Sequence, residues 1–266
     1  MRLFDSHCHI SDEAFDENRD ALIEQIRASS VALCTDVGSD LATSLKCAAA
    51  AEKYDFVYAA AGCHPHEAKD FDEAQLEQIA KLLSLPKVRA LGEIGLDYHY
   101  DFSPRDVQQY WFAAQLSAAK ELGCPIIIHS REAEEDTMRI LKDSGIFGRN
   151  RVVIHCFSGS AELARQYVKL GADISLAGPV TFKNARRPVE VVQTVPLEHL
   201  FVETDSPYMA PVPFRGQTNT PVHVEEVARK FAEIKGLPLE EVAEATFRNA
   251  CAFYGIESGD VSGDSI

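Results

Sequence analysis

The chain has 266 residues, of which 46% are hydrophobic and 25% charged, the composition of an ordinary globular protein with a substantial core. This composition excludes disordered and fibrous classes, and no apolar run approaches the roughly 18 residues that a membrane span needs. With 41 acidic and 26 basic residues the net charge is −15, which argues against tight, sequence-reading binding of duplex DNA.

Eight short apolar runs alternate with amphipathic segments along the chain. Most runs are continuous rather than alternating, which favours parallel strands buried on both faces. The runs are residues 3–4, 31–34, 56–61, 88–91, 125–128, 152–154, 172–176 and 200–202. We therefore predict an α/β fold, specifically a (β/α)8 TIM-type barrel. A doubly wound sheet is the alternative, but no Gly-x-Gly-x-x-Gly motif follows the first run.

Two of the amphipathic segments have clear ends. A helix is predicted after Ser103 as N-cap, with Pro104 at its first position, closing at Gly123. Its apolar positions are Val107, Trp111, Ala114, Ala118 and Leu122. A second helix is predicted from about residue 160 to residue 170. We find no domain boundary, so residues 1–256 are predicted to form one barrel domain, and residues 257–266 a flexible C-terminal tail.

Potential metal ligands follow the predicted strands at their C-terminal ends, where the active site of an α/β barrel lies. Imidazole and carboxylate side chains bind Zn, Mn, Fe, Ni and Mg. Six such side chains from five strands suffice for two divalent cations about 3.5–4 Å apart, which lower the pKa of a shared water. The sequence thus predicts two divalent metal cations and leaves open Mg, Mn, Zn or Ni. The six residues are His7, His9, Glu93, His129, His155 and Asp205.

Other histidines and the cysteines are assigned less specific roles. His199 precedes the eighth strand and is expected at the opposite end of the barrel, away from the chemistry. His99 and His223 are expected at the surface. Cys8, Cys63 and Cys156 adjoin predicted ligands and are expected to pack as small buried hydrophobes. Seven scattered cysteines without a Cys-x-x-Cys pair, and no apolar leader, favour a reduced, cytoplasmic protein.

Several segments, taken together, resemble the TatD-type metal-dependent hydrolases, a family of barrel metallohydrolases. They are residues 4–9 (FDSHCH), 62–66 (GCHPH), 92–98 (GEIGLDY), 128–131 (IHSR), 155–159 (HCFSG), 203–208 (ETDSPY) and 213–216 (PFRG), followed by Asn219 and Pro221. The resemblance runs from Asp5 to the region of Asn249. One departure is Cys63, where many members have Val.

The resemblance implies roles for individual residues. His7, His9 and Asp205 would hold the first metal, His129 and His155 the second, and Glu93 would bridge them. Asp205 is the best candidate to accept the proton of the attacking water, so Asp205 and Glu93 are the predicted catalytic residues. Arg131 and Arg215 are predicted to bind phosphate, with surface ion pairs as the alternative, and His64 to hydrogen-bond the scissile group.

The resemblance also implies a substrate, because family members are deoxyribonucleases that trim DNA from the 3′ end. The expected partner is a single-stranded or frayed DNA end, with neither a membrane nor a stable protein partner. The alternative is a metallohydrolase of another ester or amide, such as an aminoacyl-tRNA ester or a small cyclic amide. A non-enzymatic metal-binding scaffold is disfavoured, because structural sites are usually closed and rich in cysteine.

Overall fold

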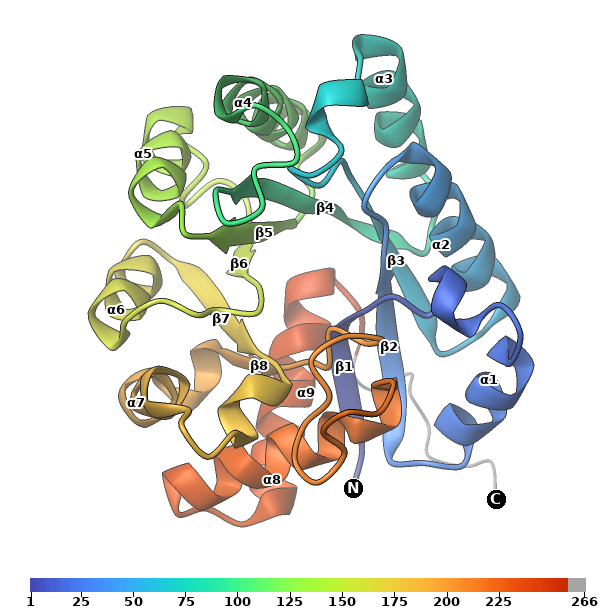
Figure 1. Cartoon of the computed structure of the whole chain (residues 1–266), viewed down its shortest axis with the longest axis vertical. Helices are drawn as coiled ribbons and strands as arrows, with labels where there is room; N and C mark the ends of the chain where they lie inside the picture. The colour runs from blue at the N-terminus through green and yellow to red at the C-terminus, as the bar shows by residue number, and fades with distance from the viewer. Residues whose placement is uncertain (258–266) are drawn as a thin grey trace.

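The structure is a computed structural model, and it describes residues 1–257. Eight parallel strands follow one another around a sheet in chain order, with helices outside them (Figure 1). The strands are β1 (Leu3–Cys8), β2 (Val31–Val37), β3 (Val57–Ala61), β4 (Val88–Asp97), β5 (Ile126–Arg131), β6 (Val152–Ile154), β7 (Ala172–Leu176) and β8 (Leu200–Val202). The predicted TIM-type barrel is confirmed.

A helix lies in every connection between consecutive strands, and two more follow β8. The helices are α1 (Arg19–Arg27), α2 (Leu41–Lys53), α3 (Glu73–Leu82), α4 (Arg105–Leu122), α5 (Glu134–Ser144), α6 (Ala161–Lys169), α7 (Arg186–Thr194), α8 (Val224–Lys235) and α9 (Leu239–Tyr254). Short 3-10 turns cover Glu13–Phe15, Ala68–Asp70, Gly178–Thr181, Leu197–His199 and Pro221–His223. Ser160 caps α6 by accepting a hydrogen bond from the Leu163 amide, as its predicted start requires.

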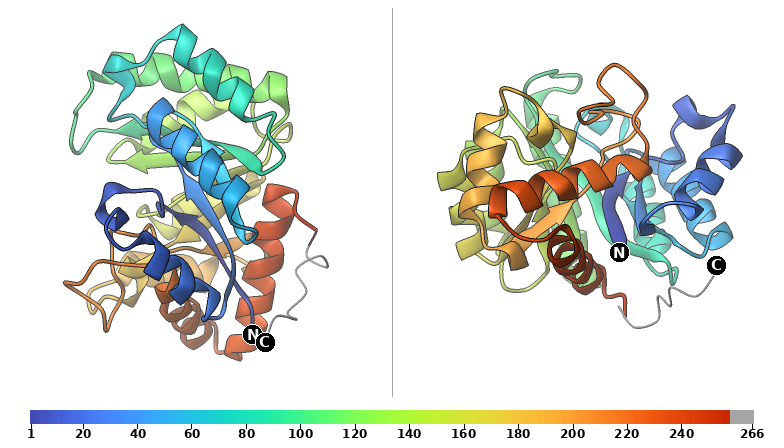
Figure 2. Two further views of the ribbon diagram at one scale, coloured as in Figure 1. Left: turned by 90° about the vertical axis from the view of Figure 1, so that its right-hand side faces the viewer. Right: turned by 90° about the horizontal axis from the view of Figure 1, so that it is seen from below.

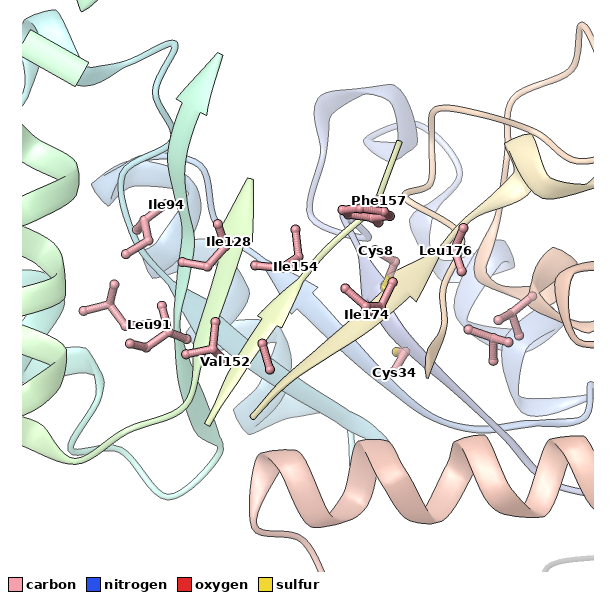
Figure 3. Close-up of a cluster of buried hydrophobic side chains, with 14 of the residues drawn as sticks. Cys8, Cys34, Leu91, Ile94, Ile128, Val152, Ile154, Phe157, Ile174 and Leu176 are labelled. Carbon is pink, nitrogen blue, oxygen red and sulfur yellow. The ribbon is translucent and has the colours of Figure 1, made fainter. Parts of the chain in front are cut away.

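Alternation along the strands divides the core into two layers. Ile127 and Val153 belong to the inner cluster. Their neighbours Ile128 and Ile154 belong to the other cluster, which packs against the surrounding helices (Figure 3). Because side chains alternate along a strand, the residues two positions after Ile127 and Val153 also face inward. This places residues 129 and 155 at the C-terminal mouth of the barrel.

Helix α9 covers the opposite end of the barrel. Phe4 and Phe201 of the inner cluster pack against Phe247 and Phe253 of α9, at ring-centroid distances of 6.1 and 5.5 Å. Figure 2 shows this helix in red beside the N-terminus. The apolar N-terminal end is therefore plugged, and the polar residues gather at the other end.

The seam between β8 and β1 is bridged by the segment that follows β8. The Asp205 amide donates a hydrogen bond of 2.9 Å to the His7 carbonyl, and the His9 amide donates one of 2.8 Å to the Ser206 carbonyl. These bonds fix the backbone after β8 against β1. Asp205 consequently lies beside the two histidines of the first strand.

Two predicted details of α4 are wrong. The helix starts at Arg105, so Pro104 is its N-cap, while Ser103 is fully buried and its hydroxyl donates to the His66 carbonyl instead of capping the helix. The buried face is also shifted by about one position, and Leu122 is exposed. The buried residues are Gln108, Trp111, Phe112, Gln115, Leu116 and Ala119.

Two buried glutamines explain the shift of this face. The Gln108 side chain accepts a hydrogen bond from the Asp97 amide and donates to the Asp97 carbonyl. Gln115 makes the same pair of bonds to the backbone of Cys63. Their side-chain amides therefore complete the backbone hydrogen bonding at the ends of β3 and β4. The pattern of apolar residues in the sequence does not reveal this role.

The cysteines, membrane-spanning helices and the end of the chain were also the subject of predictions. All seven cysteines are free thiols; Cys8 and Cys63 are buried, and Cys156 is partly buried. No helix within residues 1–257 combines the length and apolar character required to cross a membrane. The predicted tail at 257–266 lies, apart from its first residue, outside the described residues.

Candidate metal centre

Glu93 lies at the middle of the polar cluster, and its two carboxylate oxygens face different histidines. Oε1 is 3.9 Å from Nε2 of His7 and 3.8 Å from Nε2 of His9. Oε2 is 3.5 Å from Nδ1 of His129 and 2.7 Å from Nε2 of His155. The carboxylate thus separates two pairs of imidazoles, one on each oxygen.

Asp205 completes the first of these pairs. Its Oδ1 is 3.7 Å from Nε2 of His7 and 3.5 Å from Nε2 of His9. The residue has φ 54°, a left-handed conformation that non-glycine residues seldom adopt and that often marks functional sites. The structure therefore brings together all six side chains that the sequence nominated as ligands.

Three of these six side chains belong to the strands themselves, and the other three lie just beyond strand ends, His9 directly after β1. His7, Glu93 and His129 lie within β1, β4 and β5, so these strands extend past the predicted apolar runs. His155 directly follows β6, and Asp205 lies three residues after β8. Strands therefore position half of the cluster, and the segments that directly follow them position the rest.

Three groups of these side chains have the spacing needed to hold a cation. Within each group the candidate ligand atoms lie within 4.8 Å of one another. The groups overlap, because His7 and Glu93 each belong to two of them. They are His7, Glu93 and His155; His7, His9 and Asp205; and His64, Glu93 and His129.

The hydrogen bonding of the cluster fits divalent cations. Within residues 1–257, no hydrogen-bond partner is found for either ring nitrogen of His7 or for Nδ1 of His155, although all three atoms are buried. Buried polar atoms without partners are rare in proteins, because leaving them unpaired costs free energy. Imidazole nitrogens and carboxylate oxygens with free lone pairs are the donor set that Zn, Mn, Ni and Mg accept.

The charges in the cluster also fit the binding of divalent cations. Burial and the charge of His155 lower the pKa of His7, which favours the neutral imidazole that ligates metals. Burial opposes ionisation of Glu93, but the charges of His155 and His64 outweigh it and hold the Glu93 pKa well below its usual range. Burial lowers the pKa of His9, yet Asp205 and Glu93 raise it more, to about 9. The carboxylates thus draw positive charge into the site.

A second set of partners orients the candidate ligands. Nδ1 of His9 is 2.7 Å from the Val37 carbonyl, and Nε2 of His129 is 3.0 Å from Oδ2 of Asp97. Nδ1 of His155 lies 3.7 Å from Oε1 of Glu203, which also accepts a 2.6 Å hydrogen bond from the Cys156 amide. Such partners fix the ring orientation and basicity of metal-binding histidines.

Asp97 and Glu203 lie within the segments that resemble the TatD family, but the sequence predicted no role for them. In the structure, Asp97 is the last residue of β4, and Glu203 directly follows β8. Each is at most 1% exposed, which is unusual for a carboxylate without a specific partner.

The predicted substrate residues lie around this cluster. His64 is buried, with its ring 4.4 Å from that of His129, and its Nδ1 accepts a hydrogen bond from the His66 amide. The Arg131 guanidinium lies 4.8 Å from the centre of the Tyr100 ring. His64 is thus part of the cluster, whereas Arg131 lies at its edge.

Arg215 lies on the loop after β8 and is exposed. Its guanidinium is 3.8 Å from the centre of the Phe182 ring. In the part of the chain that the structure describes, neither Arg131 nor Arg215 forms an ion pair with a carboxylate. Both cations therefore remain available to an anionic ligand.

His199 lies at the other end of the barrel. Its Nδ1 is 2.9 Å from Oδ1 of Asp173, near the start of β7. This position agrees with the structural role expected for it. His99 is exposed, and His223 is partly buried with its ring stacked on Phe214 at 3.9 Å. The expectation of a surface position is thus correct for His99 and wrong for His223, because Phe214 and Asn219 cover its ring.

Comparison with known proteins identifies the family. A family model described as TatD related DNase matches residues 4–255. The chain belongs to the TatD family. This TatD protein is 44% identical over 254 residues to the uncharacterized metal-dependent hydrolase YabD of Bacillus subtilis, covering 96% of this chain and 99% of YabD. It is 36% identical to the uncharacterized metal-dependent hydrolase YcfH of Escherichia coli K12, covering 97% of each chain.

A solved structure supports the same assignment. The crystal structure of YjjV, a TatD homologue from Escherichia coli K12, superposes with a TM-score of 0.90 at 32% identity. The match covers 96% of this TatD protein and 98% of YjjV. The resemblance inferred from the motifs is therefore confirmed over nearly the whole chain.

Proposed function

We propose that this TatD protein is a metal-dependent hydrolase that uses two divalent cations to cleave phosphodiester bonds at the 3′ end of DNA. The observation that carries the proposal is the position of Glu93, whose two oxygens face two separate pairs of histidines. A carboxylate in this position could bridge the two cations of a two-metal site. The family description as a DNase supports DNA as the substrate.

The distances support the ligand sets that the family resemblance implies. His7, His9 and Asp205 would hold one cation, and His129 with His155 the other, with Glu93 shared between them. When bound, two such cations supply Lewis acidity at a phosphoryl oxygen and lower the pKa of a water between them.

The side chains of this protein would supply proton transfer and positioning. Asp205 is 8% exposed and directs Oδ1 at the cluster, so its carboxylate can accept a proton from the attacking water. His64 lies beside His129 and can hydrogen-bond the phosphate. Arg131 and Arg215 can each present a fork of N–H donors to phosphate oxygens.

The net charge of −15 is compatible with action at a DNA end. Affinity for duplex DNA grows with the number of phosphates that cations neutralise, and a protein that grips only an end needs few such contacts. Hydrolysis of another ester or amide would use the same ligands, so substrate tests must separate the two activities.

The decisive experiment loads the purified protein separately with Mg, Mn, Zn or Ni. Each form is assayed on single-stranded and blunt duplex oligonucleotides labelled at either end, and on aminoacyl esters and small cyclic amides. Stepwise shortening from the 3′ end is the expected result. Turnover of an ester or amide without any cleavage of DNA would overturn the nuclease proposal and support the alternative.

Glu93→Gln tests the two-metal site in the same assay. The amide is a poor bridge, so we expect most activity to be lost, with metal content reduced and the fold retained. Glu121→Gln, at an exposed position in the last turn of α4, is the matched control and should behave as wild type. Full activity and full metal content in Glu93→Gln would contradict the proposed site.

A further inference from the structure

Two aromatic side chains stand exposed in the loop between β4 and α4. Tyr100 is 47% exposed and Phe102 is 55% exposed. Their rings stack on each other, with centroids 5.2 Å apart and an interplanar angle of 22°. Large aromatic rings are usually buried in a monomer, and an exposed stacked pair commonly marks a binding surface.

This pair lies one side chain away from the metal centre. The His66 ring packs against Phe102 at 4.8 Å and against Tyr100 at 5.4 Å. Nε2 of His66 is 3.1 Å from Oδ2 of Asp97, and the same oxygen is 3.0 Å from Nε2 of His129. A ligand reacting at the cluster would therefore have its adjoining part beside the two rings.

The loop that carries the rings is held by hydrogen bonds on both sides. The Tyr100 amide donates to Oδ1 of Asp97 at 2.9 Å. The Ser103 hydroxyl donates to the His66 carbonyl at 2.8 Å and accepts from the Lys69 amide at 3.0 Å. The exposure of Tyr100 and Phe102 is consequently built into the fold, and the rings are positioned before any ligand binds.

A cation accompanies the rings. The Arg131 guanidinium lies over Tyr100 at 4.8 Å, and Arg131 is the last residue of β5, two positions after His129. Stacked aromatic rings beside an unpaired arginine suit a ligand that combines a flat base with a phosphate. Surfaces that bind single-stranded nucleic acid use this combination.

We propose that Tyr100 and Phe102 form a platform on which a base of the DNA end stacks, next to the scissile phosphate. The inference rests on the proposed nuclease function and adds the group that the enzyme recognises. Stacking on an aromatic ring tolerates any base. It requires an unpaired base, since bases within a duplex are stacked on their own neighbours, and so it selects single-stranded or frayed ends.

The test removes the rings and, separately, the bases. The Tyr100→Ala/Phe102→Ala double variant is compared with Tyr100→Phe and Phe102→Tyr, which keep aromatic rings. Tyr110→Ala is the control, because Tyr110 is 57% exposed but contacts Glu73 and Trp111 rather than the cluster. Each protein is assayed on a 5′-labelled single-stranded oligonucleotide and on the same oligonucleotide with abasic sites at its last three positions.

We expect the double variant to raise KM for the normal oligonucleotide roughly tenfold, with little change in kcat. Tenfold corresponds to about 1.4 kcal/mol, within the range found for stacking of one base. The wild type should show the same rise in KM on the abasic substrate, and the double variant should show no further rise there. The two conservative variants and Tyr110→Ala should match the wild type.

Other outcomes overturn the platform in distinguishable ways. Equal KM values of the wild type for the normal and abasic substrates would overturn the platform while leaving the nuclease function intact. No cleavage of either substrate would overturn the nuclease function and the platform together. An altered oligomeric state in the double variant with unchanged KM would assign the rings to a protein interface instead.

Discussion

Asp97→Asn is the substitution that tests most directly how the metal centre is positioned. Oδ2 of Asp97 is 3.0 Å from Nε2 of His129, and Oδ1 accepts hydrogen bonds from the amides of His99 and Tyr100 at 3.0 and 2.9 Å. Asparagine keeps the shape and one acceptor oxygen, so the loop can retain its amide bonds. What disappears is the negative charge that orients and polarises the His129 ring.

The magnitude follows from the type of contact that is lost. A hydrogen bond to a charged group contributes about 1.5–3 kcal/mol, which is roughly a 10- to 100-fold change in an equilibrium constant. Replacing a carboxylate that orients a metal-binding histidine typically lowers metal affinity or activity by about 10- to 100-fold. We therefore expect Asp97→Asn to weaken binding of the cation proposed at His129 and His155 by this factor.

Metal titration by calorimetry and kcat/KM at saturating metal give the two readouts. Asp173→Asn is the matched control, because Asp173 also pairs with a histidine, His199, at 2.9 Å, but at the far end of the barrel. It should leave metal affinity and turnover unchanged. The same loss of metal affinity in both variants, or no loss in Asp97→Asn, would refute the positioning role.

Three further substitutions test other parts of the site. Gly95→Ala should abolish activity, because Gly95 has φ 147° and a methyl group there would collide with the His129 carbonyl. Gly123→Ala is the control: with φ 67° and open space around it, it should lower the unfolding free energy by only about 1 kcal/mol and leave activity intact. His199→Ala should reduce unfolding free energy by about 1 kcal/mol without changing turnover, and a hundredfold loss of turnover would show that His199 acts in the site. Arg215→Lys should lower kcat/KM on DNA roughly tenfold through loss of bidentate contact with metal content unchanged. Arg187→Lys on α7 should have no effect, and equal losses in the two variants would refute a specific contact between Arg215 and phosphate.

The order of the elements was predictable because buried parallel strands are continuous apolar runs. β6, β7 and β8 begin and end where the apolar runs do. The lengths of β1, β4 and β5 were not predictable in this way. Their C-terminal parts contain polar residues, among them His7, Glu93 and His129, which remain in strand conformation while facing a polar mouth.

The ligand candidates could be found from position alone, but their supporting residues could not. His7 and His155 stand out as histidines at strand ends. Gln108 and Asp97 look like ordinary surface residues in the sequence, and only the fold shows that their side chains bind backbone or His129 inside the protein. A hydrophobic pattern records which faces are apolar, and it carries no information about polar groups buried with specific partners.

The charge of the centre bears on the proposed DNA substrate, because the protein is acidic. Glu93, Asp97, Glu203 and Asp205 are all buried around the same histidines, and such a cluster repels phosphate. Two divalent cations would balance these four carboxylates, leaving Arg131 and Arg215 to supply net positive charge at the mouth. On this basis the phosphate contacts depend on bound metal, whereas the stacking surface of Tyr100 and Phe102 is complete without it. If both proposals hold, recognition of the base and activation of the phosphate are separable in this barrel.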